Sequence, residues 1–249
     1  MIQVFKQNWL NYAIEAWALG MFMLSATFFV SIIELPYLPI RENITDPMLR
    51  RCLIGIMMGC TAIALIYSPW GRRSGAHMNP AVTLAFLFLR KIALWDALAY
   101  IIAQIMGAVV AMQIAKSIFP IILSDPAVNF VQTLPGKQGV LVAFIAEYFL
   151  AMGMILLVLY SSNASRTAPY TGIFAGMLVM VYISLEAPLS GMSINPARTL
   201  GSAVAALHFN DYWLYLTAPT AGMLSAAMLW RWYLCQKSEF VCSMSGKEK

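Results

Sequence analysis

The chain has 249 residues, of which 61% are hydrophobic and 11% are charged, and its mean hydropathy is +0.73. This composition excludes a soluble globular domain and predicts an all-α integral membrane protein. The net charge of +5 is not arranged as a basic stripe interleaved with aromatic residues, so we expect the lipid bilayer, and no nucleic acid, as partner. No phosphate-binding glycine-rich loop and no metal-ligand spacing occurs, so we expect no cofactor, no metal and no enzymatic activity.

Six apolar segments are long enough to cross a bilayer, because a hydrocarbon core of about 30 Å needs about 20 helical residues. They cover residues 11–33, 50–69, 95–118, 139–160, 170–187 and 211–234. An even number of spans places both termini on one side. Ten of the 16 Lys and Arg residues lie on that side, which predicts cytoplasmic termini, with a cytoplasmic tail at 235–249, in a plasma or bacterial inner membrane.

Two further apolar runs, 81–89 and 197–207, are too short to span and would reach about half the core thickness as helices. The same tripeptide opens both runs, as Asn79-Pro80-Ala81 and as Asn195-Pro196-Ala197. Asn favours the position before a helix and Pro its first residue, so each run is predicted to be a re-entrant half-helix. A non-helical approach is tolerated at membrane depth only where protein buries it or water lines it, which indicates an aqueous path.

The two halves of the chain, about 10–118 and about 139–234, repeat each other. The matched features are Glu15 with Glu147, the pair Gly55 and Gly59 with the pair Gly172 and Gly176, and Tyr100 with Tyr215. Because each copy holds three spans and one half-helix, the second copy enters the membrane from the opposite side. The sequence therefore predicts an inverted repeat within a single transmembrane channel domain, 1–249, with its site at the bilayer midplane.

In such a repeat the N-termini of the two half-helices face each other. The positive ends of their dipoles would oppose cations and protons but not a neutral hydrogen-bond acceptor. Asn79 and Asn195 would cap the helices and keep amide N–H groups to donate into the pore. The alternative is two caps in packed loops, but a symmetric pair beside half-length helices favours the pore.

The segments Ser-Gly-Ala-His-Met-Asn-Pro-Ala (74–81) and Ser-Gly-Met-Ser-Ile-Asn-Pro-Ala-Arg (190–198), with Glu15 and Glu147, resemble the aquaporin, or major intrinsic protein, family over nearly the whole chain. The resemblance implies six helices plus two half-helices per protomer, one pore in each protomer, and a homotetramer. It places Arg198 in the outer constriction, the selectivity filter, and His77 in the loop of the inner half. It implies that Glu15 and Glu147 hydrogen-bond the backbone of the re-entrant loops; a catalytic carboxylate pair is the weaker alternative.

Three further filter positions follow from alignment with the family. Met192 matches a loop position and Ile183 one on the fifth helix, while the second-helix position falls on Gly59 by direct count or on Met58 if residues 68–73 contain a one-residue insertion, which we favour. Water-selective members usually have Phe on the second helix and His on the fifth. Both are missing here, which predicts a less polar constriction.

Other positions point to different permeants. Thr199 and Ala203 follow the smaller pattern of water channels, whereas Tyr215-Leu216 keeps only the aromatic half of an aromatic-Trp pair typical of them. We expect a passive channel for water, with small uncharged solutes as further permeants. The alternatives are a facilitator of glycerol, hydrogen peroxide or metalloid acid with little water selectivity, and a non-conducting membrane interaction protein. Glu186 is expected to be solvated near a span end.

Overall fold

The computed structural model describes residues 2–245, and in this part of the chain all regular secondary structure is helical. Six long helices correspond to the six predicted spans. They are α1 (Ile2–Glu34), α3 (Pro47–Tyr67), α6 (Leu94–Ile118), α8 (Val140–Ser162), α9 (Thr171–Ser190) and α11 (Tyr212–Ser245). The connections contain short helical turns: α2 (Pro39–Asn43), α4 (Pro69–Ser74), α7 (Pro120–Ser124), η1 (Asn129–Val131) and η2 (Ala168–Tyr170).

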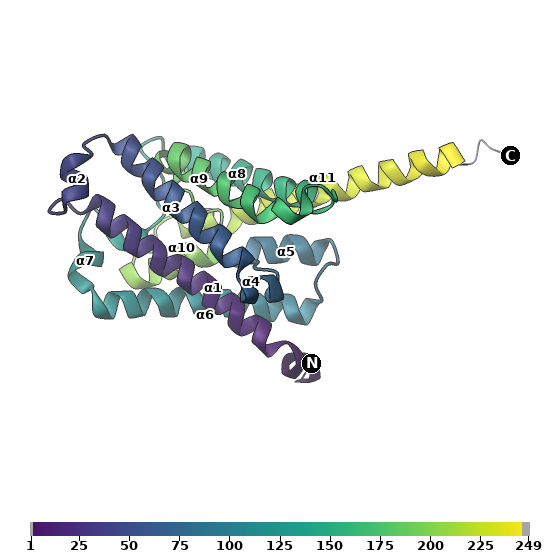
Figure 1. The fold of residues 1–249 in the computed structure, drawn as a ribbon, viewed down its shortest axis with the longest axis horizontal. Helices are drawn as coiled ribbons and strands as arrows, with labels where there is room; N and C mark the ends of the chain where they lie inside the picture. Colours follow the sequence, from purple (N-terminus) through teal and green to yellow (C-terminus); the bar gives the residue numbers. More distant parts are fainter. Residues whose placement is uncertain (1, 246–249) are drawn as a thin grey trace.

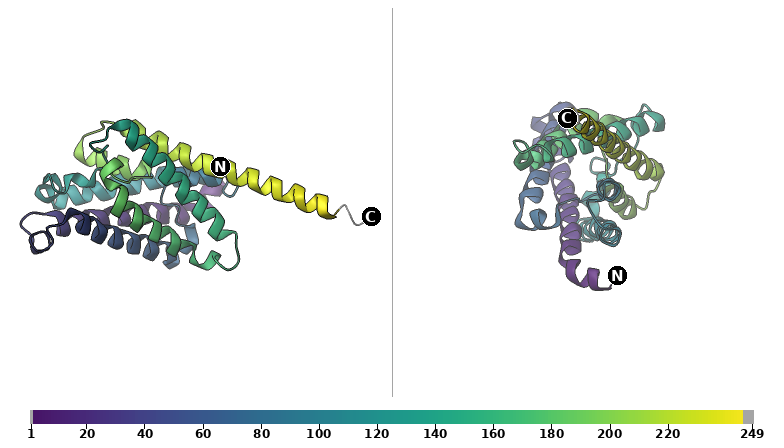
Figure 2. Two further views of the ribbon diagram at one scale, coloured as in Figure 1. Left: turned by 90° about the horizontal axis from the view of Figure 1, so that it is seen from above. Right: turned by 90° about the vertical axis from the view of Figure 1, so that its right-hand side faces the viewer.

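Five helices in the described residues are long and apolar enough to cross a membrane, and they correspond to the first five predicted spans to within two residues at the ends where a span extends past its helix. The sixth, α11, has sufficient length, but its Tyr, Trp, Thr and Pro residues make it less apolar than the others. It also continues beyond the predicted end at 234 and projects from the bundle (Figures 1 and 2). The N-terminal end of α1 and the C-terminal end of α11 lie toward the same end of the bundle.

The two short apolar runs form half-helices, α5 (Pro80–Phe88) and α10 (Pro196–Ala206). With 9 and 11 residues, they are about 14 and 17 Å long, roughly half of a hydrocarbon core. Figure 1 shows α10 and α5 along the long axis of the bundle, on either side of its middle. The predicted six helices and two half-helices are therefore present.

Glycines set the closest helix contacts. A Cβ atom built on Gly59 would lie 2.5 Å from the carbonyl oxygen of Gly176, and one on Gly176 would lie 2.8 Å from that of Gly59. This close approach joins α3 to α9, one helix from each repeat. Gly107 likewise lies against the backbone of Ala16 where α6 crosses α1. Small residues at such crossings let two backbones approach, the usual way in which membrane helices associate.

Candidate functional site

Asn79 and Asn195 are the capping residues directly before the half-helices α5 and α10, and their side chains also link the two half-helices. The Asn79 side-chain oxygen accepts from the Ala81 N–H at 2.9 Å, and that of Asn195 accepts from the Ala197 and Arg198 N–H groups at 3.1 and 3.2 Å. Pro80 and Pro196 occupy the first helical positions, where no N–H is needed. These are the contacts that Asn-Pro boundaries make at helix starts.

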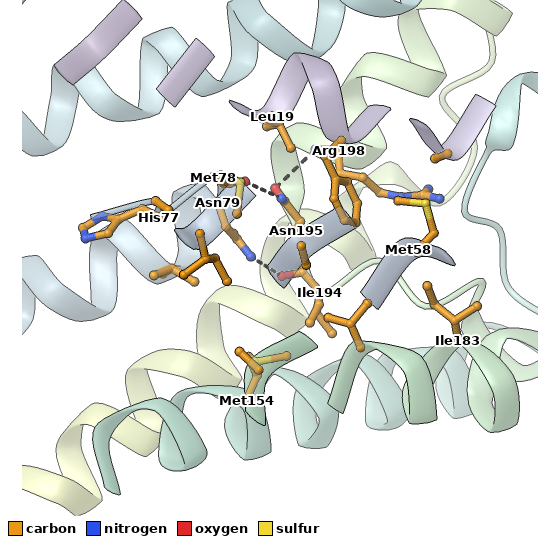
Figure 3. A pocket seen from close by; sticks show the side chains of 18 of the residues that line it. Leu19, Met58, His77, Met78, Asn79, Met154, Ile183, Ile194, Asn195 and Arg198 are labelled. Carbon is orange, nitrogen blue, oxygen red and sulfur yellow. Dashed lines mark hydrogen bonds between the residues drawn. The ribbon is translucent and has the colours of Figure 1, made fainter. Parts of the chain in front are cut away.

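The amide nitrogens of the two asparagines reach across to the opposite loop. Asn79 Nδ2 donates to the Ile194 carbonyl oxygen and Asn195 Nδ2 donates to that of Met78, both at 2.7 Å. Figure 3 shows this reciprocal pair. A primary amide has two N–H donors, so each asparagine joins the half-helices with one and retains the other at the cavity wall.

The loop before each half-helix has the same unusual backbone. Gly75, Ala76 and Met78 have φ values of +87°, +47° and +47°, and the equivalent residues Gly191, Met192 and Ile194 have +80°, +51° and +45°. Non-glycine residues pay about 1–3 kcal/mol each for this region, so surrounding contacts must hold it. The symmetry of the strain shows that both repeats need the same loop geometry.

Buried carboxylates provide those contacts. Glu147 in α8 accepts from Ser190 Oγ (2.7 Å), the Ser193 N–H (2.7 Å) and the Ile194 N–H (2.6 Å). Hydrogen bonds to an ionised acceptor are roughly twice as strong as neutral ones.

Glu15 in α1 does the same in the first repeat. It accepts from Ser74 Oγ (2.7 Å), the His77 N–H (3.0 Å) and the Met78 N–H (2.7 Å). The glutamates of α1 and α8 therefore each hold the re-entrant loop of their own repeat.

Two tyrosines complete the support behind the loops. Tyr100 donates to the Ser74 carbonyl oxygen at 2.7 Å, and Tyr215 donates to that of Ser190 at 2.6 Å. Tyr215 is fully buried and is absent from the cavity wall. Tyr215 therefore supports the loop and does not line the pore.

One cavity of about 930 Å³ passes between the half-helices. Its wall includes Arg51 near the start of α3 and Tyr67 at the end of that helix, so the cavity follows α3 over most of its length. Asn79 and Asn195 also belong to the wall. His77, in the loop between α4 and α5, also lies on this wall, with Nδ1 3.1 Å from Thr83 Oγ1. Burial lowers the pKa of His77 below its usual value, against a smaller opposing effect of Glu15, so a neutral imidazole is expected near pH 7.

The proposed filter positions converge on one part of this wall. Met58 from α3, Ile183 from α9 and Arg198 from α10 all line the cavity (Figure 3), and so does Met192 from the loop before α10. Gly59 does not line it and lies against Gly176 in the helix contact described above. Of the two second-helix alternatives, Met58 is therefore the one that faces the cavity.

Arg198 brings a charge to this otherwise apolar segment. It forms neither of the two salt bridges found among the described residues, and its Nη1 is buried without a hydrogen bond to the protein. Among the residues that the structure describes, the cavity wall contains Arg51, Arg72 and Arg198 but no Asp or Glu. The electrostatic character of the path is therefore cationic.

The structure corrects the predicted surroundings of one residue near the site, Glu186, and reveals another, Gln104, that was not predicted from the sequence. Glu186 is buried, contrary to the expectation of a solvated side chain, because α9 continues to Ser190 and keeps residue 186 inside the helix. Gln104 was not predicted, yet its Nε2 donates to Glu15 at 2.8 Å and to Thr83 at 3.1 Å. An amide in the middle of an apolar span was the signal that could have revealed it.

The comparisons with known proteins agree with this architecture. Residues 8–230 match the family model described as "Major intrinsic protein". The chain is 31% identical to "Aquaporin NIP1-2" of Arabidopsis thaliana over 71% of its own length and 61% of the relative's. It is 37% identical to "Glycerol uptake facilitator protein-like 6" of Lactiplantibacillus plantarum, over 70% of this chain and 81% of that one.

The alignment with the plant relative thus spans under two thirds of that protein. Among solved structures, the aquaglyceroporin from Plasmodium falciparum superposes with a TM-score of 0.76 at 18% identity, covering 93% of this chain and 98% of that chain, which shows a shared fold. Since the family match covers most of the sequence, the chain belongs to the major intrinsic protein family of membrane channels.

Proposed function

We propose that this protein is a passive channel for water and small uncharged solutes that excludes ions and protons. One observation carries the proposal: the cavity runs between the N-termini of two opposed half-helices whose capping asparagines form part of its wall. Transport down a gradient needs only this path. We expect no cofactor or energy source to take part.

Exclusion of charge follows from three features of the wall. Each half-helix places about half a positive elementary charge at its N-terminus, where the two meet. Arg198 adds a full charge at the constriction, and no carboxylate on the wall offsets it. A cation would also have to exchange its hydration shell for a wall that is largely apolar, which is unfavourable.

The range of neutral permeants depends on the constriction. Met58, Ile183 and Met192 present three apolar side chains beside Arg198, so a solute with both carbon and hydroxyl groups finds matching surfaces. The names of the relatives, an aquaporin and a glycerol uptake facilitator, support water and glycerol as the first permeants to test. Hydrogen peroxide and undissociated metalloid acids belong to the same class of small uncharged solutes.

The cellular setting belongs to the same proposal. We place the channel in a plasma or bacterial inner membrane, with cytoplasmic termini, in agreement with the Lys and Arg distribution and with the common end shared by α1 and α11. A homotetramer is supported by family membership. Each protomer would hold its own path, since the cavity is lined by one chain.

Proteoliposomes in a stopped-flow instrument test this function. Vesicles with the protein should shrink faster than empty vesicles under an impermeant osmolyte, and should re-swell faster in glycerol. The matched control is Ile183→Trp, which places a large ring in the cavity and should abolish both effects. Equal rates for protein and empty vesicles would contradict the proposal, and so would a measurable cation current.

A further inference from the structure

Two adjacent arginines at the start of α3 have opposite surroundings. Arg50 is buried, and its guanidinium donates to both Glu34 carboxylate oxygens at 3.1 Å and to the Ile44 and Thr45 carbonyl oxygens at 2.8 and 3.0 Å. Arg41 also pairs with Glu34. The carboxylate at this corner of the molecule is therefore shared by Arg50 and Arg41, and Arg50 has a structural role.

Arg51 has no such set of partners. It lines the cavity, takes part in neither salt bridge of the described residues, and its Nε is buried without a hydrogen bond to the protein. Its Nη2 contacts only Met48 Sδ, at 3.4 Å, and a thioether is a weak acceptor. The side chain is only half-buried, so the N–H donors of its terminal nitrogens are accessible from the cavity and can bind an oxygen that a solute supplies.

The position of Arg51 relates it to the constriction. Arg51, Ile54 and Met58 lie at helical spacing on the face of α3 that lines the cavity. Met58 follows Arg51 by seven positions, which corresponds to about 10 Å along the helix axis. Arg198 lies beside Met58 in Figure 3 and has its own unpartnered Nη1. A solute entering at this end meets Arg51 before it meets Arg198.

We propose that Arg51 is a second specificity-determining residue, which selects uncharged solutes bearing several hydroxyl oxygens before they reach Arg198. A guanidinium offers N–H donors in a planar fork and no acceptor, so it binds a molecule with oxygens on neighbouring carbons better than a single water. The proposal rests on the proposed channel function. It adds that the entrance, and not only the constriction, discriminates between permeants.

The test compares Arg51→Met and Arg51→Lys with the wild type and with Arg73→Met, an exposed arginine absent from the cavity wall. Glycerol uptake is measured over a range of concentrations, and water flux in the same vesicles. Arg51→Met should lower glycerol permeability at low concentration about fivefold and raise the half-saturating concentration, with water flux changed less than twofold. Arg51→Lys keeps the positive charge but lacks the planar fork of donors, so its glycerol permeability should lie between those of the wild type and Arg51→Met. Arg73→Met should match the wild type.

The outcomes separate this proposal from the general one. Gel filtration establishes that each variant is folded. If Arg51→Met does not fold, the comparison of Arg51→Lys with the wild type tests the proposal. Unchanged glycerol kinetics in a conducting variant would overturn the role of Arg51 and leave the channel function intact. A parallel fall in water and glycerol flux would also overturn it, because that indicates a structural effect. A wild type that conducts neither would overturn both proposals.

Discussion

Glu147 and Glu15 are buried in equivalent places of the two repeats, but only Glu15 has a glutamine, Gln104, beside it, so the same substitution should change the stability of the protein by different amounts. Glu147 accepts three hydrogen bonds from the second re-entrant loop, and Glu15 accepts the equivalent three from the first. Glu15 also accepts from Gln104, whose own Oε1 is buried without a partner. We predict that Glu147→Gln destabilises the protein more than Glu15→Gln.

The magnitude follows from counting donors and acceptors. In Glu147→Gln the new Nε2 group faces the Ile194 N–H, so a charge-assisted bond is lost and two donors oppose each other, at a cost of about 3 kcal/mol. In Glu15→Gln the Met78 N–H suffers the same loss. However, Gln104 can turn its amide so that Oε1 accepts from the new Nε2, which recovers about 1 kcal/mol.

Thermal unfolding of the detergent-solubilised protein, followed by gel filtration at a fixed heating rate, measures this difference. For a chain of this size, 1 kcal/mol shifts the midpoint by about 2–4 °C. Glu147→Gln should therefore lower it by about 6–12 °C, and Glu15→Gln by about 2–4 °C less. The exposed Glu42→Gln, which should have no effect, is the control. An equal or larger shift for Glu15→Gln would refute the reasoning about Gln104.

Three other substitutions test the path and its walls. Arg198→Ala should raise proton conductance, measured with a pH-sensitive dye inside vesicles; unchanged exclusion would remove the filter role of Arg198. Met58→Ala should widen the constriction and raise glycerol permeability relative to water, whereas an unchanged ratio would place selection elsewhere. Gly59→Ala should cost about 1–3 kcal/mol of stability, because its Cβ would lie 2.5 Å from the Gly176 carbonyl oxygen and α3 would have to move away from α9; a wild-type melting midpoint would contradict that contact.

The fold was predictable because its determinants are local. A span is recognised by its apolar length, and the helix starts at Pro80 and Pro196 follow from Asn-Pro, whose capping chemistry involves only the first turn. The inverted arrangement follows from counting spans between matched motifs. The exception is the end of α11, which extends past 234 since no proline or glycine stops it there.

Side-chain direction was harder to predict because a membrane helix is apolar on every face. The alternatives Met58 and Gly59 are adjacent in sequence, and only the rotation of α3 about its axis decides which one faces the cavity. The same holds for Arg50 and Arg51, which are neighbouring charges at the start of the second predicted span. Their different roles depend on whether Glu34, on another helix, lies within reach.

The repeat also bears on the proposed selection at one end of the path. In the proposed function, the symmetric elements, namely the loops, the capping asparagines and the glutamates, oppose charge at the middle of the path equally from both sides. Each proposed filter residue has an equivalent in the other repeat, and these equivalents also line the cavity. Met58, Ile183, Met192 and Arg198 correspond to Ala175, Ile66, Ala76 and Val82. The second set has no charge and no donor fork, and it has the smaller alanine where the first has methionine, while isoleucine is kept at the fourth position. In the proposed function, the shared scaffold supplies a symmetric part of the charge exclusion, to which Arg198 adds. The choice among neutral solutes then depends on Arg51 and on the three positions, Met58, Met192 and Arg198, at which one copy has diverged from the other.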